Sequence, residues 1–322
     1  MEPVHSGVAT HVIDGIAVAP FMTPKSLRQG LDFVARKGDL LQVTYPKSGT
    51  HWLLYITQLI LKEDEPIGSY EELLGSTRFI EYELDAPEYK SSTEIRSLCT
   101  HLPLRKDKLN PEAKYIYLAR NPWDVCDSCY RQEADFGNLR PGESAFDEFL
   151  EKFLTGQMHR GCYFQHLMAG YSLRDEPNVL FLTYEQLKRD TRATVLALAR
   201  FLGTRYEKML QEADGDGRVR LHSLLQRISA DNMRKVLRID LLQTCRPVLK
   251  KLADGLISSS KASQAEKPGT YSFTRKAQIG SWKERFSPEN LRAMEACIAE
   301  KTRGSDVMNL WSDIRAEALS RC

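Results

Sequence analysis

The chain has 322 residues and a formal net charge of only +2, with 42% of its residues hydrophobic and 27% charged. This length and composition predict one globular domain with a substantial core. The near-balance of charge argues against nucleic-acid binding through a broad basic face. The apolar runs are far shorter than the roughly 18 residues of a membrane span, and the N-terminus lacks the pattern of a secretory signal. We therefore expect a cytoplasmic protein with neither a membrane nor a nucleic-acid partner.

The first informative element is an apolar strand predicted over residues 40–44, which runs through a short loop into a helix beginning near Thr50. The loop contains Lys47, Ser48 and Gly49. Free N–H groups at a helix start favour an anion, Gly49 lets the backbone approach it, and Lys47 adds a positive charge. The usual triphosphate loop is absent, because the lysine precedes the glycine. A phosphate site is predicted, although such a run can also be only a polar turn.

Two later strands are predicted over residues 115–119 and Val179–Thr183, followed by helices that begin near Pro122 and Tyr184. Strands that alternate with helices favour an α/β fold, in which helices flank a parallel central sheet on both faces. Each strand ends where a polar motif begins. Ligands of such sheets bind beyond the carboxyl ends of the strands, so we expect these motifs to share one crevice.

Two further helices, over residues 145–153 and 194–202, have the apolar spacing of core elements. Residues 258–269 lack periodicity and read as a lid or a solvated linker. We expect a single domain over residues 1–322, with residues 1–20 and about 313–322 as flexible ends.

Taken together, the motifs resemble those of the cytosolic sulfotransferases, which move a sulfuryl group from 3′-phosphoadenosine 5′-phosphosulfate (the donor) to hydroxyls and amines. The resemblance covers most of the chain. Its ordered segments are Tyr45 to Trp52, Thr100-His101-Leu102-Pro103-Leu104, Tyr117 to Asn121 with Asp124, Val125 and Ser128, and Arg275-Lys276 with Gly280, Trp282 and Lys283. It implies a P-loop-like strand-loop-helix within a single sulfotransferase domain.

The resemblance implies two catalytic residues. His101 matches the general base that takes the acceptor proton, and Lys47 matches the cation at the oxygen that leaves the sulfuryl group. The family usually has a lysine two residues before the base, where this chain has Cys99. We expect either reduced turnover or compensation by a neighbouring cation such as Arg96 or Lys106.

For the donor, the resemblance implies a second anion site, in which Arg120 and Ser128 bind the 3′-phosphate. Trp52 would stack on the adenine, and Tyr184 would contact its edge. Ala230 replaces the family's stacking phenylalanine. The full donor-binding set is Lys47, Ser48, Gly49, Thr50, His51, Trp52, Arg120, Ser128, Tyr184, Ser229, Met233, Arg275, Lys276 and Ala277, of which His51 replaces a threonine and Ala277 replaces a glycine.

The acceptor is expected to be a small molecule such as a phenol, a catecholamine-like amine or a steroid. Family position suggests Phe21, Phe79 and Tyr130 as pocket walls, although all three could equally be core residues. Glu81 and Asp85 raise the possibility of an amine-bearing acceptor. A homodimer is possible, but the family's dimerisation signature is not kept across Lys283, Ser287, Pro288 and Arg292.

No metal is expected. The seven cysteines are scattered, which fits reduced thiols, and the C-x-x-C pair Cys126 and Cys129 falls on a predicted helix without a second ligand pair. Two rival functions remain: a catalytically weakened or inactive nucleotide-binding member of the same fold, and a small-molecule kinase. A kinase would need an acidic magnesium site and would prefer ATP.

Overall fold

The computed structural model describes residues 11–13, 16–18, 22–83, 93–135, 139, 144–159, 161–240, 270–274 and 277–322. Its strands are β1 (His11–Ile13), β2 (Ile16–Val18), β3 (Asp39–Thr44), β4 (Arg78–Phe79), β5 (Arg96–Thr100), β6 (Lys114–Ala119), β7 (Val179–Thr183), β8 (Arg238–Asp240) and β9 (Thr270–Ser272). Strands β3, β6 and β7 confirm the three strands predicted from the sequence.

The helices of the N-terminal half are α1 (Pro24–Asp32), α2 (Thr50–Leu61), α3 (Tyr70–Gly75), α4 (Ile80–Glu83), α5 (Pro122–Asp135) and α6 (Ala145–Thr155). They are followed by α7 (Tyr163–Tyr171), α8 (Tyr184–Arg189), α9 (Thr191–Leu202), α10 (Thr204–Gln211), α11 (Arg220–Arg227), α12 (Ala230–Val236), α14 (Pro288–Lys301) and α15 (Ser312–Leu319). Short 3₁₀ helices are η1 (Lys106–Lys108), η3 (Ser281–Glu284) and η4 (Val307–Trp311). No helix in these ranges is long and apolar enough to span a lipid bilayer.

The central sheet has the strand order β4-β5-β3-β6-β7, and all its pairings are parallel. The register aligns the strands at their carboxyl ends. Val43 in β3 pairs with Thr100 in β5, Thr44 pairs with Leu118 in β6, and Ala119 pairs with Thr183 in β7. The predicted α/β fold is confirmed, and one edge of the sheet carries the starts of several polar loops.

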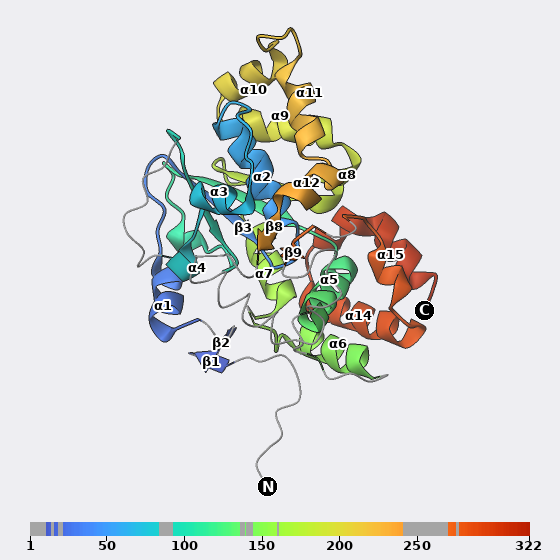
Figure 1. Cartoon of the computed structure of the whole chain (residues 1–322). Helices are drawn as coiled ribbons and strands as arrows, with labels where there is room; N and C mark the ends of the chain where they lie inside the picture. Colours follow the sequence, from blue (N-terminus) through green and yellow to red (C-terminus); the bar gives the residue numbers. More distant parts are fainter. Residues whose placement is uncertain are drawn as a thin grey trace.

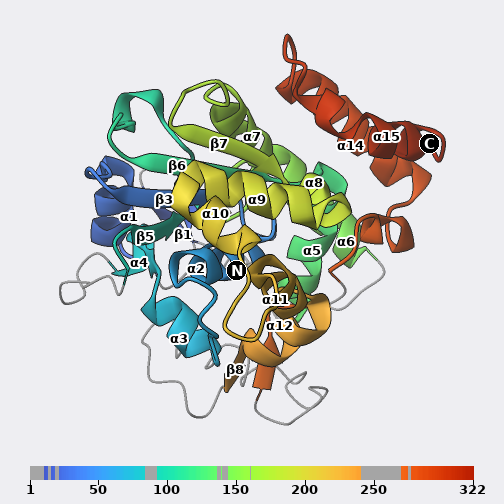
Figure 2. The same cartoon turned by 90° about the horizontal axis from the view of Figure 1, so that it is seen from above.

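Helices cover both faces of this sheet (Figures 1 and 2). Successive residues of each strand point to opposite faces, so each strand contributes side chains to two core clusters. Ile116 and Leu118 join a core cluster with residues of α2 and α8 to α12. Tyr115 and Tyr117 join a second cluster with residues of α5, α6, α7, α14 and α15. Burial on both faces explains why the strands read as apolar runs in the sequence.

Helix α2 lies in the interior, and every one of its residues except His51 is buried. A helix that is buried on all sides is fixed in position by packing on every face. Its N-terminus is therefore held rigidly against the end of β3. This rigidity keeps the loop between the strand and the helix in one shape.

The C-terminal segment is fastened to the rest of the domain. Trp311 is buried and donates from Nε1 to Glu185 at 2.6 Å, and the other carboxylate oxygen of Glu185 accepts from the amide of Asn121 at 2.7 Å. Residues 313–322, which we expected to be flexible, instead include most of α15. Ile314 and Ala318 on this helix are buried in the core, which holds the helix in place.

Candidate active site

The loop between β3 and α2 forms an anion cradle. Gly49 is the N-cap of α2, with φ of +107°, and no side chain caps the first N–H groups of the helix. A Cβ added at Gly49 would lie 2.8 Å from the ring of Tyr184, so only glycine fits. Lys47 also has a positive φ, of +71°. The first-turn N–H groups of α2 are thus left for an anion, as the sequence predicted.

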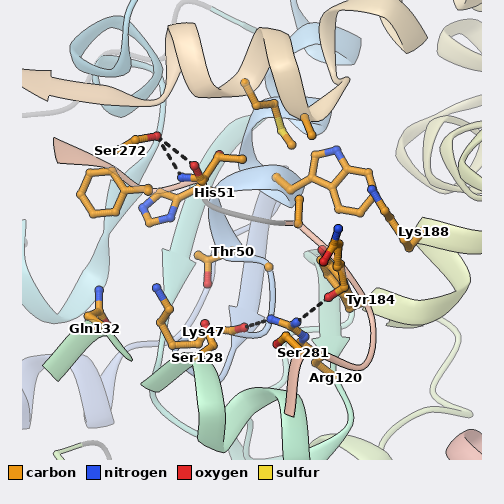
Figure 3. Close-up of a pocket in the computed structure, with 18 of the residues that line it drawn as sticks. Lys47, Thr50, His51, Arg120, Ser128, Gln132, Tyr184, Lys188, Ser272 and Ser281 are labelled. Carbon is orange, nitrogen blue, oxygen red and sulfur yellow. Dashed lines mark hydrogen bonds between the residues drawn. The ribbon is translucent and has the colours of Figure 1, made fainter. Parts of the chain in front are cut away.

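A cavity of about 470 Å³ opens over this loop (Figure 3). Residues from the ends of β3, β5, β6 and β7 all line it. It brings together the expected base His101 and most of the predicted donor set, namely Lys47, Gly49, Thr50, His51, Trp52, Arg120, Ser128, Tyr184, Ser229, Met233 and Ala277. Ser48 belongs to the same loop but is buried beneath it, and its Oγ has no hydrogen-bond partner in the described part of the chain.

His101 follows β5 directly and is held by its neighbours in one orientation. Its Nδ1 lies 2.8 Å from the carbonyl oxygen of Thr44, which can only accept, so Nδ1 carries the ring hydrogen in the neutral imidazole. The other nitrogen, Nε2, therefore holds the lone pair. The Oγ1 atoms of Thr44 and Thr50 are 2.7 Å apart, which links this contact to the start of α2. The geometry gives His101 the tautomer that a base needs.

Burial is the largest influence on the pKa of His101 and lowers it below the ordinary value. Glu81 and the carbonyl of Thr44 oppose this shift, whereas His159 and Lys47 add to it. Glu81 itself is fully buried, and its Oε1 accepts the backbone N–H of His101 at 2.8 Å. Our suggestion that Glu81 faces an acceptor amine was therefore wrong, because this carboxylate points to the backbone. Asp85 lies outside the described residues.

Arg120 closes the opposite end of the cavity. Its guanidinium lies 4.4 Å over the ring of Tyr184 and donates to the carbonyl oxygens of Lys47 and Gln278, both at 3.1 Å. Its Nε is buried without a partner among the described residues. Ser128 lines the same cavity from α5. Its Nη2 also lies 3.6 Å from Oδ2 of the buried Asp124, which balances part of its charge. Arg120 therefore fastens the phosphate loop to Gln278 and lines the cavity.

Trp52 forms a further wall. Its ring packs edge-on against Tyr184 at 5.5 Å, and Nζ of Lys188 lies 5.6 Å over it. Ser229 caps α12 by accepting from the N–H of Asn232, and Met233 on that helix is buried beside the cavity. This end of the cavity is flat and apolar, with a cation at its edge.

Ala277 has φ of +50°, the left-handed region that favours glycine. The glycine usual in relatives thus has a physical reason at this position. Arg275, Lys276 and the acceptor-wall candidate Phe21 lie outside the described residues, as does the 258–269 segment.

The other two acceptor-wall candidates differ. The ring of Phe79 lies 5.4 Å from that of His101, beside the base. Neither of the two lines the cavity, and the ring of Tyr130 packs edge-on against Phe146 and Phe149 instead of lying near His101. Its neighbours are residues of α6, so it occupies the core position that the sequence left open.

Cys99 is fully buried on β5, where burial and the nearby Glu81 raise the pKa of its thiol well above the ordinary value. Neither cation that we considered as a replacement for the missing lysine reaches it. Arg96 lies at the opposite end of β5 and forms two hydrogen bonds with Asp39. Lys106 is exposed and pairs with Glu176. The expected compensation by Arg96 or Lys106 was wrong.

The surroundings of the C-x-x-C pair are those of buried core cysteines. Cys126 and Cys129 both lie on α5 and are buried, and burial raises the pKa of the Cys129 thiol to about 12. Across the described ranges, no group of three or more His, Cys, Asp or Glu side chains is placed to hold a metal ion.

Sequence reasoning missed a row of side chains along α5. Arg131, Gln132 and Asp135 line the cavity together with Ser128, and Figure 3 shows Gln132 and Ser128. Their spacing of three, four and seven residues from Ser128 is the helical repeat, which was available as a signal. Phe273, just after β9, was missed as well, because nothing in its local sequence marks it as facing the phosphate loop.

The comparisons with known proteins agree with this geometry. The family model of the sulfotransferase domain matches residues 37–244, so the chain belongs to the sulfotransferase family. An amine sulfotransferase of Oryctolagus cuniculus is 28% identical over 296 residues, which cover 90% of this chain and 88% of the relative. A 3-alpha-hydroxysteroid sulfotransferase of Cavia porcellus is 30% identical over 292 residues, covering 88% of this chain and 90% of the relative.

Solved structures share the fold. Mouse sulfotransferase SULT7A1, solved with PAP, superposes with a TM-score of 0.64 at 23% identity, covering 96% of this chain and 99% of that one. Retinol dehydratase, solved with androsterone and the inactive cofactor PAP, gives a TM-score of 0.67 at 20% identity, covering 92% of this chain and 91% of that one. These superpositions show that the chain has the fold of these solved structures.

Proposed function

We propose that this sulfotransferase moves a sulfuryl group from 3′-phosphoadenosine 5′-phosphosulfate to a hydroxyl or amine of a small, mostly aromatic or apolar acceptor. The observation that carries the proposal is the position of His101. Its Nδ1 is occupied by the carbonyl of Thr44, and it lines the same cavity as Lys47 and Arg120. A base, His101, and two cations, Lys47 and Arg120, around one cavity suit the transfer of a sulfuryl group from an anionic donor.

Unpartnered polar groups support an anionic nucleotide in this cavity. Trp52 Nε1 and Arg120 Nε belong to residues that line the cavity, and both atoms are buried without hydrogen-bond partners in the described part of the chain. Two regions of positive charge, Lys47 and Arg120, fit the two phosphate positions of the donor. Trp52 and Met233 offer the apolar wall that an adenine ring needs.

The reaction follows from these positions. The acceptor oxygen or nitrogen forms the new bond to sulfur, while the bond between sulfur and the bridging phosphate oxygen breaks. His101 takes the acceptor proton on Nε2. Lys47 stabilises the electron pair that remains on the leaving oxygen.

A titration tests the donor. We expect 3′-phosphoadenosine 5′-phosphate (PAP) to bind much more tightly than ADP in calorimetry, because Arg120 and Ser128 would bind the 3′-phosphate. Tight ADP binding with no preference for PAP would overturn the assignment and favour a kinase.

The chemical class of the acceptor is identified with a labelled donor and a panel of phenols, catecholamine-like amines and hydroxysteroids. The names of the curated relatives make amines and hydroxysteroids the first classes to compare. A nucleotide-binding protein with weakened catalysis is the second candidate function, because buried Cys99 supplies no charge to the sulfuryl group. PAP binding without transfer to any member of the panel would favour that candidate.

A further inference from the structure

His51, which stands where the family often has a threonine, contacts the side chains of Tyr70 and Phe273. Its Nε2 lies 2.8 Å from the hydroxyl oxygen of Tyr70. Its ring centroid lies 4.5 Å from that of Phe273, and the Tyr70 ring lies 4.6 Å from the same phenyl ring. The three rings therefore pack against one another. We call them the His51 cluster.

The His51 cluster joins three separate parts of the chain. His51 is in the first turn of α2, directly after the phosphate loop, and Tyr70 is the first residue of α3. Phe273 follows β9, and its N–H donates to the carbonyl of Leu237 at 3.1 Å. Phe273 is also only four residues before Ala277, which lines the cavity. The cluster thus connects the phosphate loop with Phe273, which lines the cavity as well.

The imidazole of His51 is neutral. Burial lowers its pKa to about 3, and the charges of Lys47 and His101 add to the shift. A neutral imidazole carries one N–H, so one nitrogen donates and the other accepts. A phenol is the better donor of this pair, and an imidazole nitrogen is the better acceptor. Tyr70 therefore donates to Nε2, which leaves the hydrogen of His51 on Nδ1.

The hydrogen on Nδ1 of His51 is available to an anion bound in the cavity. Nδ1 of His51 has no hydrogen bond to any described residue, whereas His51 lines the cavity. In Figure 3 the side chain of Lys47 points towards the imidazole from below, with Thr50 between the two backbones. A phosphate bound by Lys47 and the N–H groups of α2 would lie next to Nδ1.

Resting on the proposed function, we propose that His51 donates its Nδ1–H to the 5′-phosphate of the donor, and that Tyr70 and Phe273 are positioning residues for this contact. Tyr70 selects the tautomer through Nε2. Phe273 holds the plane of the ring. The histidine thus replaces a short hydroxyl donor by a longer one that needs two supports from elsewhere in the fold.

The test uses the full chain with PAP and with adenosine 3′-phosphate, which lacks the 5′-phosphate. Tyr70→Phe keeps the ring and removes the hydroxyl. We expect it to weaken PAP binding by about three- to tenfold, the range for one hydrogen bond, and to leave binding of adenosine 3′-phosphate unchanged. Tyr171→Phe is the matched control, since it removes a phenol hydroxyl that binds Asp306 away from the cavity.

A second measurement reports the tautomer directly. In ¹⁵N-histidine NMR of the wild-type protein with PAP, we expect the His51 signals of an Nδ1–H imidazole, assigned by their loss in His51→Thr. In Tyr70→Phe they should move towards the Nε2–H form. An Nε2–H tautomer in the wild-type complex, or unchanged PAP affinity in Tyr70→Phe, would overturn the proposal. Failure of the wild-type protein to bind PAP would instead overturn the proposed function.

Discussion

The carbonyl oxygen of Thr44 lies 2.8 Å from Nδ1 of His101, so the last residue of β3 fixes the orientation of the side chain that follows β5. Thr44 also precedes the phosphate loop. One backbone carbonyl therefore sets the position of the base relative to the anion cradle. Since β3 and β5 are neighbours in the sheet, this distance is maintained by the strand pairing itself.

His101→Ala should abolish sulfuryl transfer while leaving PAP affinity nearly unchanged. The loss of a general base lowers the rate by about 10²- to 10⁴-fold. The transfer of labelled sulfate measures the rate, and calorimetry with PAP measures the affinity. The exposed His222 supplies the control variant His222→Ala, which should behave as the wild type. Activity that survives in His101→Ala would remove His101 from the mechanism.

Glu81→Gln should move the acid limb of kcat/KM to lower pH. The reaction needs neutral His101, so activity falls as the pH drops below the pKa of His101. The charge of Glu81 raises this pKa, so its removal lowers the pKa further. The amide still accepts the His101 N–H, which keeps the fold. The pH profile measures the shift, and Glu112→Gln, an exposed carboxylate paired with Lys37, is the control. If the acid limb of the kcat/KM profile does not move in Glu81→Gln, Glu81 does not raise the pKa of His101.

Cys99→Lys should raise kcat by about tenfold or more, because a cation near the sulfuryl group stabilises the charge of the transition state. Cys99→Met is the matched control, since it adds a long side chain without charge. Single-turnover transfer separates the chemical step from product release. If the lysine and methionine variants have equal rates, the missing charge is already supplied elsewhere.

Ala277→Gly should keep or raise the free energy of unfolding. A left-handed backbone costs an L-residue about 1 to 2 kcal/mol, whereas the added freedom of glycine in the unfolded chain costs about 0.4 to 1 kcal/mol. Ala277→Val should destabilise by more than about 1 kcal/mol, since a branched side chain fits this region poorly. Urea denaturation measures both.

The control for that series is Ala197→Gly, the same substitution at an exposed position inside α9. There we expect a loss of about 0.5 to 1 kcal/mol, the opposite sign. A loss of similar size at both positions would show that the conformation of Ala277 carries no strain.

The fold was predictable where burial leaves a strong pattern. Strands β3, β6 and β7 are apolar runs because both faces of each strand are covered. Strand β5 was missed, although His101 follows it directly, because Arg96–Thr100 is short and mixes polar with apolar residues. Its place in the sheet comes from its neighbours β3 and β4.

The shape of the loop was predictable where one local segment forms it, as at Lys47 and Gly49 between β3 and α2. It was not predictable where contacts come from distant segments. The hydroxyl of Tyr70 meets His51 from the next helix, and Phe273 reaches it from more than 200 residues along the chain. Glu81 was misread because its sequence context does not reveal that it faces the backbone of His101.

The bond between Trp311 and Glu185 has a practical consequence for handling the protein. Glu185 also holds Asn121, the neighbour of Arg120, so a chain cut before residue 311 would lose a support directly behind the cavity that we propose for the donor. Cys322 follows Trp311 in the chain and is exposed. A purification tag or an immobilisation linker therefore belongs after the last residue, whereas shortening the C-terminal segment to aid crystallisation would risk the nucleotide site itself.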